Sequence, residues 1–250
     1  MKAQVLSLNG ETIREVDLPA QFETAFRPDL IKKAVIALQS TRYQPHGTNP
    51  FAGITASAVG WGSGRGASHV PRLKNSSRAA KVPQAKGGRA AHPPKVAKVL
   101  IRSINKKEKR KALHSAIAAT ANEDIVRSRG HKFTGSLPFV LSDEFEDLNQ
   151  TRHVIACLKA IGVYTDIERS ALSRKVKPGR GKMRGRRYKQ RKSLLIVTGS
   201  KALRAARNLA GVDVCSIKSL NVEHLAPGTH ASRLTIWTES ALSKLAERDQ

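Results

Sequence analysis

The feature that most constrains the fold is a stretch of 57 residues, from 42 to 98, that cannot build a hydrophobic core. It holds eight Gly, six Pro, ten Lys or Arg and three His, and its apolar residues are mostly Ala and Val. Small side chains bury too little surface to offset the entropy lost when the backbone is ordered. We therefore expect an extended segment that is either disordered or ordered by an external partner. As an out-and-back extension, it would reach at most about 90–100 Å.

Carboxylates are distributed unevenly along the chain. Lys and Arg total 45 and Asp and Glu total 19, giving a formal net charge of +26, yet residues 30–107 and 169–212 contain no Asp or Glu. A second basic segment, residues 169–192, has 12 Lys or Arg among 24 residues. Because a carboxylate that faces phosphates would repel them, acid-free basic segments indicate a polyanionic partner. The chain is therefore expected to bind nucleic acid.

The composition of the two basic segments favours structured RNA. Gly and Pro interrupt both segments, which excludes a single groove-inserting helix, and no zinc-finger, basic-zipper or RNP motif is present. Aromatic residues make up only 4% of the chain, which argues against a base-stacking platform. Irregular Arg- and Gly-rich extensions suit the crevices of folded RNA. A protein of acidic membranes or of compacted DNA would instead carry an amphipathic basic helix or Lys-rich repeats.

Outside residues 44–98, hydrophobic periodicity predicts one α/β domain made of residues 1–43 and 99–250. Residues 3–18 predict a hairpin with a type I′ turn at Asn9-Gly10, and Pro28 opens a helix. Further strands are expected at 137–141, 194–199, 212–217 and 234–238, and helices at 106–122, 151–161, 200–211 and 239–250, with a short helix or turn at 220–228. Apolar strands that alternate with helices predict a three-layer domain with a mostly parallel sheet.

The sequence offers no enzyme active site. The only acidic cluster is interpreted as a solvated loop and consists of Asp143, Glu144, Glu146 and Asp147. The glycines of residues 60–66 lack the Lys-Ser or Lys-Thr and the strand-to-helix setting of a phosphate-binding loop. They are interpreted as backbone that approaches a partner closely, with Arg65 supplying charge and Trp61 a stacking face. An RNA-modifying or RNA-processing enzyme with basic arms is the alternative, but it requires a cofactor fingerprint or an acid–base constellation that is not visible.

Cysteine and histidine usage indicates neither a metal site nor a disulfide. Cys157 and Cys215 lie in apolar runs and are expected to be buried thiols in a reducing compartment. No Cys or His has metal-ligand spacing, and no metal or other cofactor is expected. No apolar stretch approaches 18 residues, and the N-terminal apolar run is too short for a signal sequence. The expected location is the cytoplasm, with no membrane partner.

Four segments, in chain order, resemble one protein family. They are SAVGWGSGRGASHVPRLK (57–74), GGRAAHPPK (87–95), KPGRGKMRGRRYKQRKSLLIV (177–197) and LNVEHLAPGTHASRLTIWTESALSKL (220–245). On these segments the chain resembles the universal large-subunit ribosomal protein four family, in its archaeal and eukaryotic form. Because no long extension of the eukaryotic kind follows Gln250, an archaeal protein is expected.

The resemblance implies a structural, non-catalytic constituent of the large ribosomal subunit. The globular α/β domain would lie on the solvent side and support assembly. The long irregular internal loop would penetrate 23S-type ribosomal RNA and help line the peptide exit tunnel. There it would meet ribosomal protein twenty-two and, near its tip, the nascent peptide.

The resemblance also assigns RNA-binding residues. Those in or near the loop tip are Trp61, Gly62, Ser63, Gly64, Arg65 and Gly66. Those along the returning limb are Arg72, Lys74, Arg78, Lys81, Lys86, Arg89, His92 and Lys95. Those on the globular body are Arg180, Lys182, Arg184, Arg186, Arg187 and Arg191. We add the neighbouring cations Arg42, Arg174, Lys175, Lys177, Lys189 and Lys192.

Overall fold

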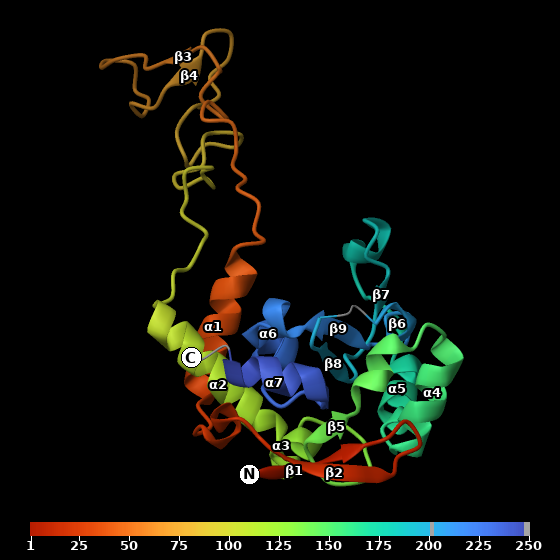
Figure 1. Ribbon diagram of the computed structural model, residues 1–250. Coiled ribbons are helices and arrows are strands. Elements are labelled where there is room, and N and C mark those ends of the chain that lie inside the picture. The colour runs from red at the N-terminus through yellow and green to blue at the C-terminus, as the bar shows by residue number, and fades with distance from the viewer. Residues whose placement is uncertain (201–202, 248–250) are drawn as a thin grey trace. The chain divides into compact units, whose positions relative to one another are not determined.

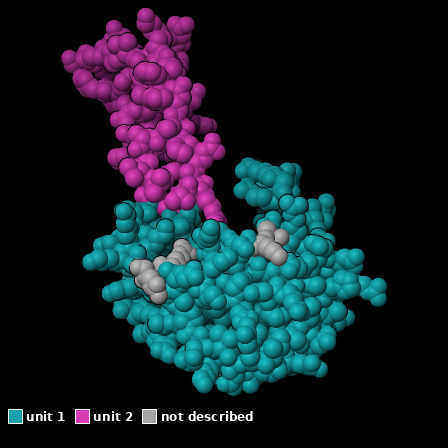
Figure 2. Space-filling view, viewed as in Figure 1, with its two compact units in different colours: residues 1–39, 102–250 teal, residues 40–101 magenta. Residues whose placement is uncertain are grey.

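The computed structural model describes residues 1–200 and 203–247. The chain divides into two compact units (Figure 2). The first, which we call the globular unit, joins Met1–Gln39 to Arg102–Gln250, and the second, the insertion unit, is Ser40–Ile101. The insertion unit therefore interrupts a single domain whose two parts lie far apart in the sequence.

A six-stranded sheet forms the centre of the globular unit (Figure 1). Its strand order is β2-β1-β5-β10-β8-β9. The strands are β1 (Lys2–Leu6), β2 (Thr12–Asp17), β5 (Phe139–Leu141), β8 (Leu195–Thr198), β9 (Asp213–Ser216) and β10 (Thr235–Thr238). Only β1 and β2 pair antiparallel, and the other neighbouring pairs of this sheet are parallel. The predicted mostly parallel sheet is confirmed.

Helices cover both faces of this sheet. One hydrophobic cluster joins one face to α1 (Pro28–Ser40), α2 (Lys106–Thr120), α6 (Val222–Leu225) and α7 (Glu239–Glu247). A second cluster joins the other face to α3 (Glu123–Ser128), α4 (Thr151–Ala160) and α5 (Tyr164–Leu172). Successive strand residues point to opposite faces, so Ile236 packs in one cluster and Trp237 in the other, both fully buried. The predicted three-layer α/β architecture is confirmed.

The N-terminal hairpin is confirmed, but the predicted type I′ turn is wrong. A type I′ turn needs positive φ at two residues, whereas Asn9 has a negative φ and only Gly10 is positive, at +86°. The Gly10 N–H donates to the Ser7 carbonyl (3.1 Å), and the Ser7 N–H donates to the Glu11 carbonyl (2.8 Å). The Ser7 hydroxyl also accepts from the N–H groups of Asn9 and Glu11. These bonds satisfy the backbone of a wider, three-residue loop with Gly10 in the left-handed position.

The helix predicted at 200–211 is wrong in the part that the structure describes, and residues 201–202 lie outside it. Arg204–Ala206 form a single 3₁₀ turn, and further turns lead to β9. Leu203, Ala205 and Ala206 are buried in the second hydrophobic cluster without forming an α-helix. Tertiary packing therefore overrides the helical periodicity of this segment. The closing helix is confirmed as far as Glu247, and residues 248–250 lie outside the described residues.

The insertion unit runs out and back, with its two limbs joined at several levels. Strand β3 (Ala58–Val59) pairs antiparallel with β4 (Arg72–Leu73), and the Thr48 N–H donates to the Pro94 carbonyl (3.1 Å). Between these levels the limbs approach closely at Gly53, where a Cβ would lie 2.6 Å from the Gly88 backbone. All of residues 41–101 are described, and only Ala58 is buried. Hydrophobic burial therefore contributes little to the order of this unit.

The second basic segment forms a small ribbon within the globular unit. Strands β6 (Lys175–Val176) and β7 (Tyr188–Lys189) pair antiparallel, and a 3₁₀ turn at Arg180–Met183 lies between them. We call residues 174–192 the basic ribbon. The prediction that Gly and Pro prevent a continuous helix in this segment is confirmed. Among the described residues, none of the helices has the length and apolar character needed to cross a membrane.

Candidate nucleic-acid interface

Trp61 is the centre of a cationic cluster at the tip of the insertion unit. The guanidinium carbons of Arg65 and Arg72 lie 5.9 and 5.2 Å from the centre of its ring, within the range of cation–π contacts. Trp61 remains 39% exposed, so part of the ring is accessible to a partner. The structure thus brings the predicted tip residues Trp61 and Arg65 together with Arg72 from β4.

Three glycines set the path of the tip backbone. Gly62, Gly64 and Gly66 have φ values of +79°, +83° and +60°, a region that other residues occupy only with strain. A Cβ at any of these positions would have no described atom within 4 Å. The close approach predicted for this backbone therefore involves no described part of the chain itself.

The cations of the returning limb fall into two groups. Arg72 donates to the Ser77 carbonyl and to Ser68 Oγ, and Arg78 donates to the Lys86 carbonyl (3.0 Å), so these two arginines hold the shape of the limb. Others pair with no carboxylate of the described chain, namely Lys74, Lys81, Lys86, Arg89 and Lys95. His92 and Lys95 line a pocket of about 700 Å³. Arg42 lies two residues after the end of α1.

Positive charge accumulates on the basic ribbon. The guanidinium carbons of Arg174 and Arg187 lie 4.5 and 5.7 Å from the centre of the Tyr188 ring, so two arginines share one aromatic side chain. Ten cations of the ribbon pair with no described carboxylate, namely Arg174, Lys175, Lys177, Arg180, Lys182, Arg184, Arg186, Arg187, Lys189 and Arg191. Such a concentration of like charge repels itself and favours a bound polyanion.

Hydrogen bonds fasten the end of the ribbon to α5. Ser170 Oγ donates to the Arg191 carbonyl (2.6 Å), and the Arg191 N–H donates to Ser173 Oγ (2.9 Å). The Lys192 ammonium donates to both carboxylate oxygens of Asp213, at 3.0 and 2.8 Å. Lys192 is thus already paired within the chain, unlike the other predicted residues of the ribbon.

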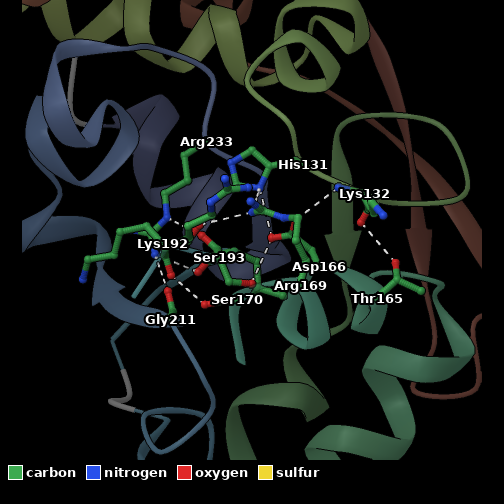
Figure 3. A network of polar contacts seen from close by, with 12 residues as sticks. His131, Lys132, Thr165, Asp166, Arg169, Ser170, Lys192, Ser193, Gly211 and Arg233 are labelled. Atoms are coloured by element: carbon green, nitrogen blue, oxygen red, sulfur yellow. Dashed lines mark hydrogen bonds and ion pairs between the residues drawn. The ribbon is translucent and has the colours of Figure 1, made fainter. Parts of the chain in front are cut away.

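Next to this attachment, the side chain of Asp166 links α5 to residues 131–132 and to Ser193 (Figure 3). Its carboxylate lies 3.0 Å from His131 Nδ1 and accepts from the Lys132 N–H (3.1 Å), Arg169 Nε (2.8 Å) and Ser193 Oγ (2.9 Å). Burial alone would raise the pKa of Asp166, but the hydrogen bonds and charges of His131 and Arg169 together lower it to about 2. Burial lowers the pKa of His131, and the contact with Asp166 only partly offsets this. At neutral pH a carboxylate therefore faces a neutral imidazole.

A buried arginine ties the ribbon's attachment to the sheet. Arg233 is 1% exposed and donates to the carbonyls of Ser193 (2.6 Å), Leu194 (3.0 Å) and Gly211 (3.0 Å). It also donates to Asp213 Oδ2 at 2.7 Å. Burial lowers the pKa of Arg233, and the pairing with Asp213 compensates part of that cost.

The Asp166 network does not have the arrangement of a catalytic triad. Ser193 Oγ donates to Asp166 and makes no hydrogen bond with His131 among the described contacts. Ser193, Asp166 and His131 are all buried, whereas a nucleophile needs both an adjacent base and access to substrate. Among the described residues, no group of three His, Cys, Asp or Glu side chains could hold a metal ion. Cys157 and Cys215 are buried as predicted, and burial raises the pKa of their thiols to about 11 and about 12.

The interpretation of the acidic cluster as a solvated loop is wrong for Glu146, whereas Asp143, Glu144 and Asp147 are exposed. The Glu146 carboxylate is buried and accepts from the Gly199 N–H (2.7 Å), Thr238 Oγ1 (2.6 Å) and Ser240 Oγ (2.9 Å). Asp143 accepts from the Ser240 N–H (2.8 Å). The carboxyl ends of β8 and β10 leave donors at one edge of the sheet, and buried donors need acceptors.

The sequence matches the family model of the ribosomal protein L4/L1 family over residues 16–248. The chain belongs to this family. Three relatives are named large ribosomal subunit protein uL4. The one from Methanospirillum hungatei is 74% identical over 245 residues, which cover 98% of each chain. The one from Methanoregula boonei is 66% identical over 248 residues, covering 99% of this chain and all of the relative. The one from Archaeoglobus fulgidus is 54% identical over 249 residues, covering 99% of each chain.

Membership of the L4/L1 family confirms the resemblance, and the archaeal relatives support its archaeal form. The family consists of structural proteins, so this chain is not an enzyme, and the alternative of an RNA-modifying enzyme is not retained. The sequence gives no individual role to Asp166, Arg129 or Arg233. Arg169 begins the second basic segment, and Arg233 lies in the 220–245 segment that carries the resemblance.

Proposed function

We propose that this member of the L4/L1 family is a structural constituent of the large ribosomal subunit in the cytoplasm. It binds 23S-type ribosomal RNA through the insertion unit and the basic ribbon, and it supports assembly of the subunit. The names of its relatives, large ribosomal subunit protein uL4, support this role. The observation that carries RNA binding is uncompensated charge, because most cations of both surfaces have no carboxylate partner in the described chain.

Binding in this proposal is electrostatic and follows the shape of the RNA. About ten or more phosphate contacts release counterions, and affinity then falls by roughly 10³–10⁵ between 50 and 200 mM salt. Arginines can bridge phosphate oxygens in pairs, while lysines act as compact charges. Trp61 and Tyr188 hold arginines in position and offer ring faces to nucleotides.

In the same proposal, residues 44–98 form a loop that penetrates the RNA and residues 1–43 and 99–250 form the body. The tip, residues 60–66, helps line the peptide exit tunnel, near the nascent peptide and ribosomal protein twenty-two. Two features support this assignment. The tip is built from glycines that need no space for side chains, and the limbs approach each other closely enough at Gly53 to exclude a Cβ.

Sedimentation of large subunits through a high-salt cushion tests the proposal. Mass spectrometry of the pelleted subunits should find the chain at about one copy per subunit. Recovery of the chain only in the supernatant would overturn the assignment as an integral constituent. The RNA-binding role of the ribbon is tested by the triple variant Arg184→Ser, Arg186→Ser and Arg187→Ser in competition with wild type during assembly.

The triple variant of the ribbon should be incorporated at least tenfold less often than wild type. A matched control removes three exposed cations outside the predicted RNA-binding set, Lys32→Ser, Arg152→Ser and Lys159→Ser, and should compete within about twofold of wild type. Equal losses in both variants would mean that net charge alone matters and would contradict a role for the ribbon.

A further inference from the structure

A basic pocket of about 800 Å³ opens on the globular unit, where the basic ribbon is attached. Its wall combines the C-terminal end of α3, the segment Pro227–Ala231, and side chains next to the ribbon's attachment. Arg129, Arg169, Arg191 and Lys192 line it, together with His131. Among the described residues that line the pocket, none is Asp or Glu. Figure 3 shows His131 and Arg169 beside Asp166, whereas the Lys192 side chain points away from them.

The charge around the pocket is not balanced. Asp166 already pairs with Arg169, and Asp213 already pairs with Lys192 and Arg233. Arg129 and Arg191 have no carboxylate partner among the described residues. Burial, together with the nearby charges of Arg233 and Arg169, lowers the pKa of Arg129 to about 10. An anion in the pocket would relieve this repulsion.

Arg129 also has hydrogen-bond donors that the described chain does not use. Its Nη1 and Nη2 each donate once, to the carbonyls of Ala231 (2.9 Å) and Pro227 (2.8 Å). A guanidinium has five N–H groups in a planar fork that matches the oxygens of a phosphate. Three of these N–H groups have no acceptor in the described chain. Arg129 therefore holds the wall with two donors and can offer others to a ligand.

The wall that Arg129 holds is conformationally strained. Gly228 and Thr229 of this wall have φ values of +75° and +73°, and the adjoining Ser232 has +66°. Two of these are not glycine, and a left-handed conformation is costly for such residues. This segment belongs to the 220–245 stretch that carries the family resemblance, yet it contributes neither to the insertion unit nor to the basic ribbon. Strain that the surrounding structure maintains is typical of ligand sites.

We propose that this pocket binds a single ribonucleotide of the ribosomal RNA, with its phosphate on Arg129 and Arg191. The pocket also presents apolar surface from Phe26, Pro28 and Ile125. Phe26 is 40% exposed, which suits contact with a base or ribose. The site would thus hold one nucleotide turned out of its helix. This inference rests on the proposed function, since it assumes that the polyanion is RNA.

Amide NMR of the full chain tests the pocket without the ribosome. Uridine 5′-monophosphate is titrated at constant ionic strength, and the amide of Gly228 reports on the pocket. We expect a saturable shift that inorganic phosphate reproduces at least threefold more weakly and that uridine does not reproduce. The amides of Gly62, Gly64 and Gly66 report on unspecific attraction of anions to the insertion unit.

Two variants separate binding in the pocket from loss of its shape. Arg129→Gln removes the charge but also weakens the hold on Pro227 and Ala231. Ser128→Glu places a carboxylate at an exposed lining position and leaves the bonds of Arg129 in place. It should weaken nucleotide binding about tenfold. Gln150→Glu, an exposed position outside the pocket with the same change in charge, should remain within twofold of wild type. Equal effects of the two Glu variants, or a Gly228 shift that does not saturate, would overturn the proposal.

Photocrosslinking in assembled large subunits identifies the occupant. Phe26→p-benzoylphenylalanine places the reactive group at the pocket, and crosslinks to ribosomal RNA are expected. Crosslinks only to a neighbouring protein would overturn the assignment of a nucleotide. A chain that sediments with the subunit but gives no RNA crosslink would refute the pocket alone. A chain that does not sediment with the subunit would refute the proposed function, while the NMR titration would still report on the pocket.

Discussion

At the scale of single residues, Asp166 joins segments that lie 35 and 27 residues away, at His131 and Ser193. Asp166→Asn keeps the size of the side chain but removes its charge, leaving the Arg169 guanidinium in a mostly buried position without its partner. We expect the free energy of unfolding at pH 7 to fall by about 3–5 kcal/mol. Urea denaturation measures this change. The exposed edge-strand control Asp17→Asn should change by less than about 0.5 kcal/mol, and equal losses would contradict the role of burial.

The same carboxylate makes stability depend on pH at the acid end. The pKa of Asp166 is about 2 in the folded chain against an ordinary 3.8, so the unfolded chain binds its proton first as the pH falls. The contribution is fully present above about pH 4 and is lost as the pH falls towards 2, and it amounts to about 2 kcal/mol. Unfolding curves of wild type and Asp166→Asn should therefore converge by about that amount between pH 5 and pH 2. A gap that does not change with pH would show that the buried group is not ionised.

At the scale of the element, the basic ribbon depends on its attachment to α5. Ser173→Ala removes the acceptor of the Arg191 N–H but leaves both hydrophobic clusters intact. Because that hydrogen bond protects the amide, we expect Arg191 to exchange with deuterium at least tenfold faster. Thr165→Ala is the matched control, since it removes a side-chain bond from the same helix, to the Lys132 carbonyl, away from the ribbon. Unchanged exchange at Arg191 in Ser173→Ala would mean that the ribbon is held elsewhere.

Elements that depend on a local apolar pattern can be predicted from the sequence. Strands were predicted at 194–199 and 234–238 and lie at Leu195–Thr198 and Thr235–Thr238, because a strand covered on both faces needs an unbroken buried run. The pattern at 200–211 fits a helix equally well as a series of turns. The structure packs Leu203, Ala205 and Ala206 in the second hydrophobic cluster, and that packing depends on neighbours that are distant in the sequence.

Part of the candidate site could also be predicted from the sequence, and part could not. The excess of cations in residues 42–98 and 169–192 is a property of the sequence itself, so both basic surfaces could be predicted. Polar contacts between distant segments leave no periodic signal. Asp166, Glu146 and Arg129 therefore resemble ordinary surface residues until the fold places donors, acceptors or strained backbone around them.

At the scale of the whole molecule, the two units differ in what holds them together. The globular unit has two hydrophobic clusters, and one of them joins the N-terminal residues Val5 and Ile31 to the C-terminal Leu242. Residues 41–101 of the insertion unit contain one buried residue, Ala58, and ten Lys or Arg lie between 42 and 98, none of which is followed by Pro. Limited proteolysis of the free chain with trypsin should therefore cut within residues 40–101 sooner than within α2, whose cations are held in a packed helix.

The fragments from cleavage in the insertion unit should remain together, because residues on both sides of the cut share one core. Size-exclusion chromatography in native buffer should show a single peak that separates only in denaturant. In assembled large subunits the same sites should be cut at least tenfold more slowly, since RNA around the limbs would exclude the protease. A free chain whose insertion unit resists trypsin would contradict the expectation that an external partner orders this unit. Equal cleavage of free and assembled chain would instead place residues 40–101 outside the RNA.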